Sequence, residues 1–242
     1  MTITHNVADG VGTVLLQRPE KHNALTPSMF AALVAAGEKL AQREDVRAIV
    51  LAGDGPSFCS GLDFGSVTDQ TRPDLVTREP GSPANLVQRA ALVWADAPVP
   101  VVAALHGHVL GGGLQIALAA DIRVAHPNTR LCVMEIHHGL IPDMGISRTL
   151  PPLLRGDIAR ELVLTGRTVA AHEALELGLV THLADAPRDR ALEIATAIAG
   201  HAPAAVRAAK ELLNRAYGTR QELLLIESAL QDKLRADRSH PR

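Results

Sequence analysis

The sequence HGHVLGGGLQ, residues 106–115, directly follows the apolar run 99–105. A second glycine-bearing segment, FCSGLDF at residues 58–64, directly follows the apolar run 46–52. Each pattern is typical of a strand that leads into a glycine turn, and HGHVLGGGLQ then enters a short apolar helix. Backbone amides at such turns and helix starts lack partners and are natural donors to negative charge. If the two turns converge, their amides can form an oxyanion hole, which stabilises an enolate.

The composition indicates one globular domain with a core of small aliphatic side chains. Of the 242 residues, 47% are hydrophobic but only 2% are aromatic, so Ala, Val, Leu and Ile must fill the core. The formal net charge of −2 leaves no overall field to attract nucleic acid, and the few aromatic residues leave little for base stacking. The two cysteines, Cys59 and Cys132, have no metal-binding spacing and form no disulfide framework. We expect Cys59 to be a small residue that fills its turn.

Targeting signals are not apparent. Residues 1–6 have neither the charged region nor the apolar region of a signal peptide. No apolar run approaches the length that spans a bilayer. We therefore expect a soluble, cytoplasmic protein with no membrane partner.

Strands and helices are expected to alternate in the first part of the chain, which predicts an α/β fold. Thr26 and Pro27 are a suitable N-cap and first residue for a helix that extends to residue 43. The other expected elements are strands at 12–17, 46–52, 99–105 and 122–125 and helices at 84–95 and 112–119. Continuous apolar strands of this kind are typical of a sheet that is buried on both faces.

Two other regions have a different character. Residues 65–83 lack periodicity and are expected to form a mobile loop, which either flanks a substrate mouth or is a passive insertion. From residue 155 onward we expect helices only, at 170–177, 188–200, 203–216 and 220–234. The predicted organisation is a core at residues 1–154 and a helical oligomerisation region at residues 155–242.

Several motifs together resemble the enoyl-CoA hydratase/isomerase (crotonase) superfamily. They are RPEKHNAL at 18–25, the two glycine turns, EIHHGLIPDMG at 135–145 and LTGR at 164–167, followed by 170–180. They occur in the family's order over most of the chain. The resemblance implies a spiral core of strand–helix repeats with a C-terminal helical region, and a homotrimer or hexamer. It also implies an acyl-CoA thioester substrate and no separate cofactor, since coenzyme A is part of the substrate.

The same resemblance implies roles for individual residues. The amides of Leu62 and Gly112 would form the oxyanion hole. The substrate-binding residues would be Lys21, Ala24, Ser60, Gly61, Asp63, Gly111 and Gln115. Phe64 and Gly65 lie where the family often has a basic residue, and the last basic-aromatic segment of the family is missing.

Gln115 is the main departure from the family pattern. Hydratases of the family carry a carboxylate at this position, and glutamine cannot take or give a proton at physiological pH. Glu135 matches the family's second catalytic carboxylate. We expect its pKa to lie above the usual value of about 4.3 because of burial among apolar side chains, supplied by Ile136, Leu140, Ile141 and Met144.

Asp143 follows Glu135 at a spacing that resembles the dienoyl-CoA isomerase branch of the family. There, a glutamate and an aspartate exchange protons with the two ends of a conjugated chain. Asp143 could instead be the N-cap of a short helix, and both roles can hold together. His137 and His138 match no catalytic position of the family.

The sequence therefore favours an acyl-CoA double-bond isomerase that uses Glu135 and Asp143. A hydratase with Glu135 as its sole acid–base group is the second hypothesis. A non-catalytic acyl-CoA-binding protein is the third. A phosphate-binding role for the glycine triplet is disfavoured, because neither GxGxxG nor GxxxxGK[ST] is present.

Overall fold

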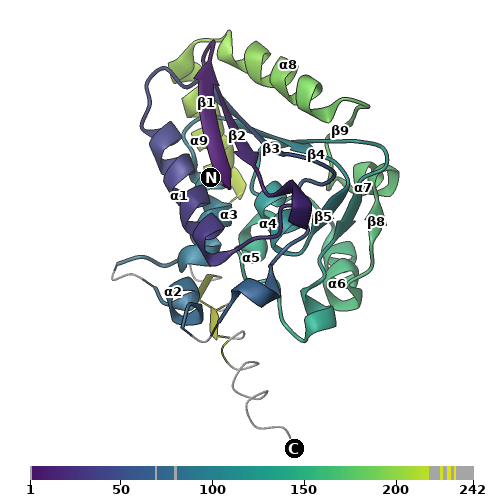
Figure 1. The fold of residues 1–242 in the computed structure, drawn as a ribbon. Coiled ribbons are helices and arrows are strands. Elements are labelled where there is room, and N and C mark those ends of the chain that lie inside the picture. Colours follow the sequence, from purple (N-terminus) through teal and green to yellow (C-terminus); the bar gives the residue numbers. More distant parts are fainter. Residues whose placement is uncertain are drawn as a thin grey trace, which may run out of the picture.

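The computed structural model describes residues 2–68, 70–78, 81–217, 224–225, 228–229 and 232 (Figure 1). The strands are β1 (Ile3–Ala8), β2 (Val11–Leu16), β3 (Ala48–Gly53), β4 (Val101–Leu105), β5 (His108–Leu110), β6 (Ile122–Ala125), β7 (Arg130–Cys132), β8 (Val169–Ala170) and β9 (His182–Leu183). The α-helices are α1 (Pro27–Ala41), α2 (Arg72–Val76), α3 (Leu86–Asp96), α4 (Gly112–Leu118), α5 (Ile146–Thr149), α6 (Gly156–Thr165), α7 (Ala171–Leu177), α8 (Pro187–Ala199) and α9 (Pro203–Tyr217). Three 3-10 helices are η1 (Pro19–Lys21), η2 (Phe64–Ser66) and η3 (Glu135–His138).

The strands form two sheets. The larger sheet has the order β1-β2-β3-β4-β6-β9, with β1 antiparallel to β2 and every other pair parallel. The smaller sheet has the order β5-β7-β8. Because β4 leads into β5 through a tight turn, the chain passes directly from the larger sheet to the smaller one. The glycine triplet follows β5.

Both faces of the larger sheet are covered by helices (Figure 1). Ala48, Val50 and Ala52 of β3 belong to one core cluster, with α8 residues that include Ala191 and Ala195. Alternate residues of β3 point the other way and pack with α1, α3 and α4. Since successive side chains of a strand point to opposite faces, a strand buried on both faces must be apolar throughout. The interpretation of these apolar runs as doubly buried strands is confirmed.

Side-chain caps define the starts of two helices. Thr26 Oγ1 accepts a hydrogen bond from the amide of Met29 at 3.4 Å, and Pro27 is the first residue of α1. Asn85 and Gln88 form a reciprocal capping box at the start of α3. The cap at Thr26 confirms its prediction, whereas the capping box was not recognised in the sequence.

The C-terminal part of the chain differs from its prediction. The expectation of helices only after residue 155 is wrong, because β8 joins the smaller sheet and β9 pairs with β6. Residues 65–83 contain the end of η2 and the whole of α2 and so are not simply a loop. The helix predicted at 220–234 lies largely outside the described residues. The division of the chain at residue 154 stays a prediction.

Helix α9 is anchored to the core through a buried lysine. Lys210 Nζ donates to Asp121 Oδ2 at 2.7 Å and to the carbonyls of Val99 and Trp94 at 3.0 and 3.3 Å. Lys210 is 6% exposed, so these acceptors replace the water that the ammonium loses. The helix is therefore tied to the end of α3 and to the segment that enters β4.

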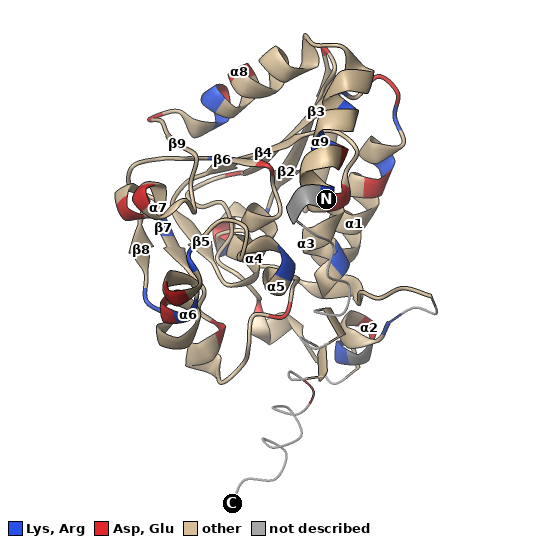
Figure 2. Ribbon diagram, turned by 180° about the vertical axis from the view of Figure 1, so that it is seen from behind, with Lys and Arg blue, Asp and Glu red and all other residues tan. Residues whose placement is uncertain are grey.

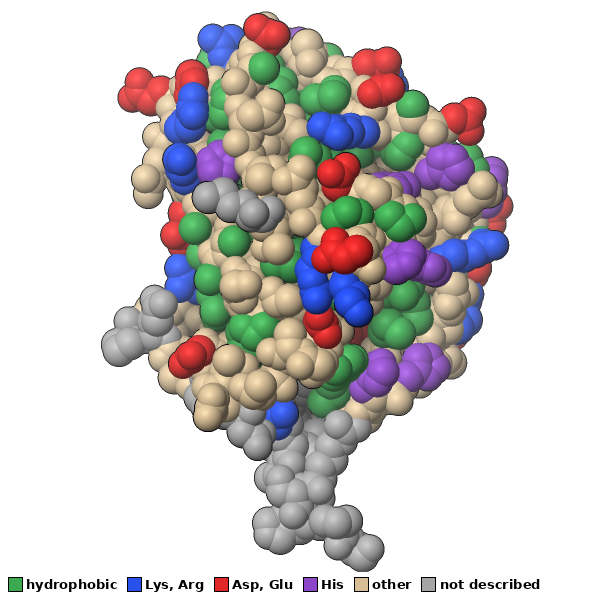
Figure 3. Space-filling model, viewed as in Figure 1, with side chains coloured by type: hydrophobic (Ala, Val, Ile, Leu, Met, Phe, Trp, Pro, Cys, Tyr) green, Lys and Arg blue, Asp and Glu red, His purple; other side chains and the backbone are tan. Residues whose placement is uncertain are grey.

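Charged side chains of both signs are interspersed along the chain and over the visible face (Figures 2 and 3). No large region of one sign is apparent on that face. Among the described helices, none is long and apolar enough to cross a membrane.

Candidate active site

The two glycine turns lie side by side. The amides of Phe58 and Cys59 donate to the carbonyls of His106 and His108 at 2.8 and 3.0 Å, and the amide of Leu110 donates back to Cys59 at 3.0 Å. The two segments therefore converge, which is the condition that an oxyanion hole requires. Parallel strands β3 and β4 end at the same edge of the sheet, which brings the two turns together.

Gly113 allows this close approach. A Cβ atom at Gly113 would lie 2.6 Å from the carbonyl oxygen of Cys59 and 2.8 Å from its Sγ atom. Any larger residue would push the two turns apart. Cys59 is fully buried, its thiol donates to the carbonyl of Asn23 at 3.1 Å, and burial raises the pKa of Cys59 to about 12. Its role as a buried filler, rather than a reactive thiol, is confirmed.

The amides of Leu62 and Gly112 are available to a ligand. Among the described residues, neither amide has a hydrogen-bond acceptor, and both residues line one pocket. Leu62 lies opposite Leu25, but the bonds of that bridge use the amides of Leu25 and Asp63. Gly112 is the first residue of α4, where an amide has no partner within the helix. This arrangement can hold one oxygen that carries negative charge.

Gln115 holds one oxygen of the Glu135 carboxylate. Gln115 Nε2 donates to Glu135 Oε1 at 2.7 Å, while its Oε1 accepts from the amide of Met144 at 2.8 Å. The other oxygen, Glu135 Oε2, is buried and has no hydrogen-bond partner among the described residues. Burial raises the pKa of Glu135 to about 7, although hydrogen bonds from its own backbone amide and from Gln115 oppose that shift. Glu135 therefore has the properties of a base that operates near neutral pH.

Asp143 lines the same pocket as Glu135, and its charge contributes to the raised pKa of Glu135. The interpretation of Asp143 as an N-cap is wrong. The N-cap of α5 is Gly145, which has φ +88°, and that cap has no side-chain hydrogen bond. A capping role therefore does not explain the acid at position 143.

The pocket has a volume of about 540 Å³ and is mostly apolar. Besides the polar groups above, its wall is formed by side chains from α1, α2, α3 and the turns: Leu25, Phe30, Phe64, Val67, Arg72, Leu75, Val76, Val87, Met134, His138, Leu140, Ile141 and Met144. The segment 65–83 thus flanks the pocket, as the first of its two interpretations proposed. The sequence analysis missed Leu75, Val76 and Val87, for which the only signal was their apolar character within or beside a polar segment.

The expected apolar surroundings of Glu135 are largely present. Leu140, Ile141 and Met144 line the pocket. Ile136 does not line it and is 39% exposed, which corrects the prediction for that residue. In a 3-10 helix, successive side chains point in different directions, so the neighbour of Glu135 in sequence points away from the pocket.

The predicted substrate-binding residues fall into two groups. Ser60, Gly61, Gly111 and Gln115 line the pocket, as do the proposed oxyanion and acid–base residues. Lys21, Ala24 and Asp63 do not. Lys21 is exposed, and their roles stay predictions.

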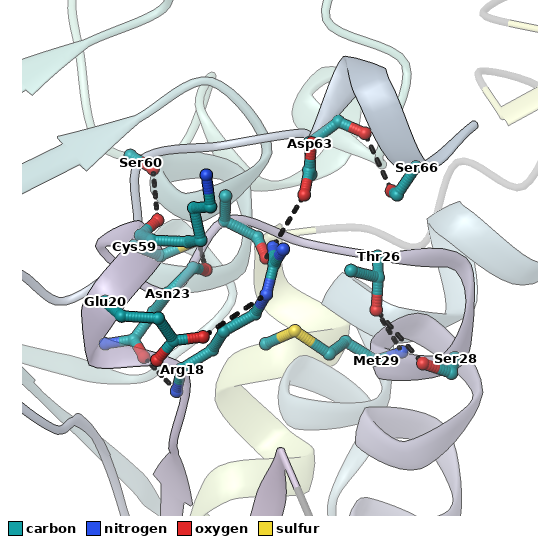
Figure 4. A network of polar contacts seen from close by, with 12 residues as sticks. Arg18, Glu20, Asn23, Thr26, Ser28, Met29, Cys59, Ser60, Asp63 and Ser66 are labelled. Atoms are coloured by element: carbon teal, nitrogen blue, oxygen red, sulfur yellow. Dashed lines mark hydrogen bonds and ion pairs between the residues drawn. The ribbon is translucent and has the colours of Figure 1, made fainter.

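Arg18, to which the sequence analysis assigned no role, supports the first turn (Figure 4). It donates to the carbonyl of Ala24 at 3.0 Å and pairs with Asp63 Oδ2 at 2.7 Å. A hydrogen bond from Arg18 lowers the pKa of Asp63, which keeps this pair ionised. Arg18 thereby connects the segment after β2 to the turn that carries Leu62.

Comparison with known proteins decides the family. The family model described as enoyl-CoA hydratase/isomerase matches residues 6–239. The chain belongs to the enoyl-CoA hydratase/isomerase family. A crystal structure of an enoyl-CoA hydratase/isomerase from Mycobacterium paratuberculosis has a TM-score of 0.87 at 26% identity, with coverage of 96% of this chain and 92% of that chain. The predicted fold class is thereby confirmed.

Relatives within the enoyl-CoA hydratase/isomerase family differ in activity. The chain is 33% identical to (E)-benzylidenesuccinyl-CoA hydratase of Thauera aromatica over 87% of its length and 81% of the relative. It is 34% identical to mitochondrial Delta(3,5)-Delta(2,4)-dienoyl-CoA isomerase of Rattus norvegicus, over 81% of its length and 63% of the relative. Sequence identity therefore assigns the chain to an enzyme family that acts on acyl-CoA thioesters. It does not distinguish hydration from isomerisation as the activity of this chain.

Proposed function

We propose that this enzyme moves carbon–carbon double bonds along enoyl- or dienoyl-CoA thioesters. The observation that carries the proposal is the asymmetric Glu135 carboxylate. Gln115 occupies one oxygen, while the other is buried and without a hydrogen-bond partner among the described residues. Such an oxygen can take a proton from carbon and return it. At position 115, where hydratases of the family carry their second carboxylate, this chain has a glutamine.

The reaction begins with the thioester oxygen between the amides of Leu62 and Gly112. Glu135 Oε2 takes a proton from C2 of a 3-enoyl substrate, and the electron pair of that C–H bond forms an enolate whose charge the two amides stabilise. Glu135 then returns the proton at C4, so the double bond moves from C3–C4 to C2–C3. The base, the acid and the oxyanion donors all come from this chain, and the step needs no further cofactor.

A 3,5-dienoyl substrate poses a longer proton transfer. Its proton leaves C2 but must be added at C6, further along the chain than one carboxylate easily serves. We propose that Asp143, in the same pocket, exchanges the proton at one of these two carbons while Glu135 acts at the other. This pairing extends the same enolate chemistry to conjugated substrates.

The pH profile tests the role of Glu135 as a base. Burial raises the pKa of Glu135 to about 7, and the base must be ionised to accept a proton. We therefore expect kcat/KM for 3-enoyl-CoA isomerisation to rise with pH, with a midpoint near pH 7, and to level off about one pH unit above that midpoint. Initial rates between pH 5 and 9 in buffers of constant ionic strength measure this midpoint. A midpoint near the ordinary glutamate value would contradict the proposed base.

Hydration is the alternative that Gln115 disfavours. Both ends of its amide are engaged, with Glu135 and with the amide of Met144, and an amide cannot exchange a proton with water. We expect Gln115→Glu to raise the ratio of 2-enoyl-CoA hydration to 3-enoyl-CoA isomerisation by about 10²-fold, the lower end of the usual contribution of general acid–base catalysis. Gln42→Glu makes the same charge change at an exposed site and is the matched control. An unchanged ratio in Gln115→Glu would place position 115 away from the water site.

A non-catalytic acyl-CoA-binding role is less consistent with the site. Keeping a carboxylate whose pKa burial has raised costs stability at neutral pH, and a binding protein gains nothing from it. A spectrophotometric panel of 3-enoyl-, 2-enoyl- and 3,5-dienoyl-CoA substrates separates the three functions. We expect turnover of the 3-enoyl-CoA and 3,5-dienoyl-CoA substrates. Hydration alone, or binding without turnover, would overturn the isomerase proposal.

We further propose that coenzyme A extends from the pocket over Lys21, Ala24 and Asp63. The segment that contains Lys21 and Ala24 adjoins the pocket wall. The amide of Ser60 donates to the carbonyl of His22 at 2.9 Å, and the hydroxyl of Ser60 donates to the carbonyl of Lys21 at 3.4 Å.

We also propose that the protein forms a homotrimer or hexamer. The exposed Leu212 and Leu213 of α9 are consistent with a subunit contact.

A further inference from the structure

The carbonyl of Gly166 receives two hydrogen bonds from the segment that carries Glu135. His137 Nε2 donates to this carbonyl at 2.8 Å, and Cys132 Sγ donates to it at 3.0 Å. A carbonyl can only accept, so the Nε2 atom of His137 must carry a proton. The two donors lie on either side of Glu135 in sequence, and both bonds end on one atom.

Gly166 is itself held in place. Its amide donates to Leu162 at 3.1 Å and closes the end of α6. The next residue, Arg167, pairs with Glu161 of α6 and Glu173 of α7 at 2.7 Å each. The Gly166 carbonyl is therefore a fixed point between two helices. These contacts give a structural role to the LTGR motif, to which the proposed reaction assigns none.

Close packing also requires glycine at this point. Gly166 has φ +61°, and a Cβ atom there would lie 2.6 Å from His137 Nε2 and 2.7 Å from Ile136 Cγ2. Both the backbone conformation and the contact therefore exclude a larger residue. The end of α6 thus packs directly against η3, the short helix that begins at Glu135.

We propose that His137 is a positioning residue that holds the Glu135 carboxylate in the pocket by anchoring η3 to the Gly166 carbonyl. The proposal rests on the proposed function, because it assigns no purpose to His137 unless Glu135 carries the proton. Cys132 supports the same anchor from the other side of Glu135. His137 itself does not line the pocket, so it acts through Glu135 and not on the substrate.

The physical need for such an anchor follows from the size of η3. This 3-10 helix has four residues, and an isolated turn of that length is unstable without tertiary contacts. Gln115 restrains only one oxygen of Glu135, and the reactive oxygen has no hydrogen-bond partner among the described residues. If η3 loosens, the carboxylate can turn toward water. A displacement of about 1 Å can cost about 100-fold in rate.

Two substitutions of His137 and one control test this role. His137→Leu removes the donor, and we expect kcat for 3-enoyl-CoA isomerisation to fall about 10- to 100-fold while KM stays within about twofold. His137→Gln retains an Nε2 donor at a similar reach, and we expect kcat within about threefold of the wild type. His172→Leu makes the same change at an exposed position of α7 and should leave kcat unchanged.

A pH readout separates positioning from a general structural role. Titratable groups near the Glu135 carboxylate include Asp143 and Cys132, with Arg72 and His138 in the same pocket wall, and these are unaltered by the substitutions. Both substitutions remove the imidazole of His137, so a shift in only one of the two variants does not come from the loss of that group. Because burial holds the pKa of Glu135 at about 7, greater access of water should move the midpoint of kcat/KM to lower pH in His137→Leu only. Circular dichroism and thermal unfolding measure the folded fraction of each variant.

If folded His137→Leu keeps the wild-type kcat and the wild-type pH midpoint of kcat/KM, the proposed anchoring role of His137 is wrong. Equal losses in His137→Leu and His137→Gln would also overturn it, since the donor would then not matter. The same holds if unfolding alone accounts for the loss in His137→Leu. Retained turnover in Glu135→Gln would instead refute the proposed function, so the two failures are distinguishable.

Discussion

Glu135→Gln is expected to lower kcat for 3-enoyl-CoA isomerisation by about 10²–10⁴-fold, the usual contribution of general acid–base catalysis. Glutamine is nearly isosteric and can still pair with Gln115 after a rotation of one amide, but it cannot accept a proton from carbon. The amides of Leu62 and Gly112 are untouched, so the thioester should still bind. Stopped-assay kinetics and calorimetric titration with a 2-enoyl-CoA product measure turnover and binding separately.

The same variant should gain stability at alkaline pH. The folded-state pKa of Glu135 is raised from 4.5 to about 7, so folding favours the protonated form. That contribution is fully present below the unfolded pKa and is lost as pH rises through about 7. Above pH 7, Glu135→Gln should therefore raise the free energy of unfolding by about 3 kcal/mol, and by much less at pH 4.5. Urea unfolding at both pH values measures the difference.

Glu176→Gln is the matched control for both readouts, because Glu176 is exposed on α7. It should change neither kcat nor the pH dependence of stability. Retained turnover in Glu135→Gln would refute the mechanism. A loss of both turnover and stability would show that Glu135 maintains the fold instead of carrying a proton.

Asp143→Asn is expected to reduce 3,5-dienoyl-CoA isomerisation by about 10²-fold or more, while 3-enoyl-CoA isomerisation falls less than about tenfold. The longer transfer needs a second proton carrier, and asparagine cannot be one. The shorter transfer needs Glu135 alone. Because the charge of Asp143 contributes to the raised pKa of Glu135, the midpoint of kcat/KM for 3-enoyl-CoA should also move to lower pH.

Stability distinguishes this interpretation from a structural one. Asparagine keeps a side-chain oxygen that can accept the hydrogen bonds of Asp143, so the melting temperature of Asp143→Asn should stay close to that of the wild type. Asp185→Asn, at an exposed position outside the pocket, controls for the loss of one negative charge. Equal losses on both substrates, or no loss on either, would contradict a two-carboxylate mechanism and leave Glu135 as the single acid–base group.

Most of the long elements could be predicted from sequence because their signals are local, but the six-residue strand β1 and the ten-residue helix α6 were not predicted. The apolar runs before each glycine turn became β3 and β4, and the strand at 122–125 has the predicted bounds. The short strands β5, β7, β8 and β9 were not predicted, since two or three residues are too few to show a period. Their pairing partners, rather than their own composition, define them as strands.

Some residues of the candidate site were likewise predicted from sequence, and others were not. Glu135, Asp143 and the two glycine turns were identified from motifs, and the structure brings all four into one pocket. The capping interpretation of Asp143 failed because a cap depends on where a helix begins, and α5 begins after a glycine at positive φ. The pocket wall from α2 and α3 was not foreseen, since its residues carry no motif.

The sequence by itself determined which residues bear the chemistry. Gln115 cannot exchange protons, Glu135 can, and glycine at position 113 permits a close approach, whatever surrounds them. These properties belong to the side chains themselves. They were sufficient to question hydration, whereas the family resemblance rested on several motifs and their order along the chain.

Only the tertiary structure decided how those residues act. Gln115 and Glu135 are 20 residues apart in sequence, and their 2.7 Å contact leaves one carboxylate oxygen without a hydrogen bond from the part of the chain that the structure describes. His137 and Gly166 are 29 residues apart, and their bond fixes the turn that carries this base. Burial, which sets the pKa of Glu135, likewise depends on segments that meet only in the folded chain. Contacts and solvent exclusion between distant segments are properties of the packed molecule, so no local pattern in the sequence specifies them.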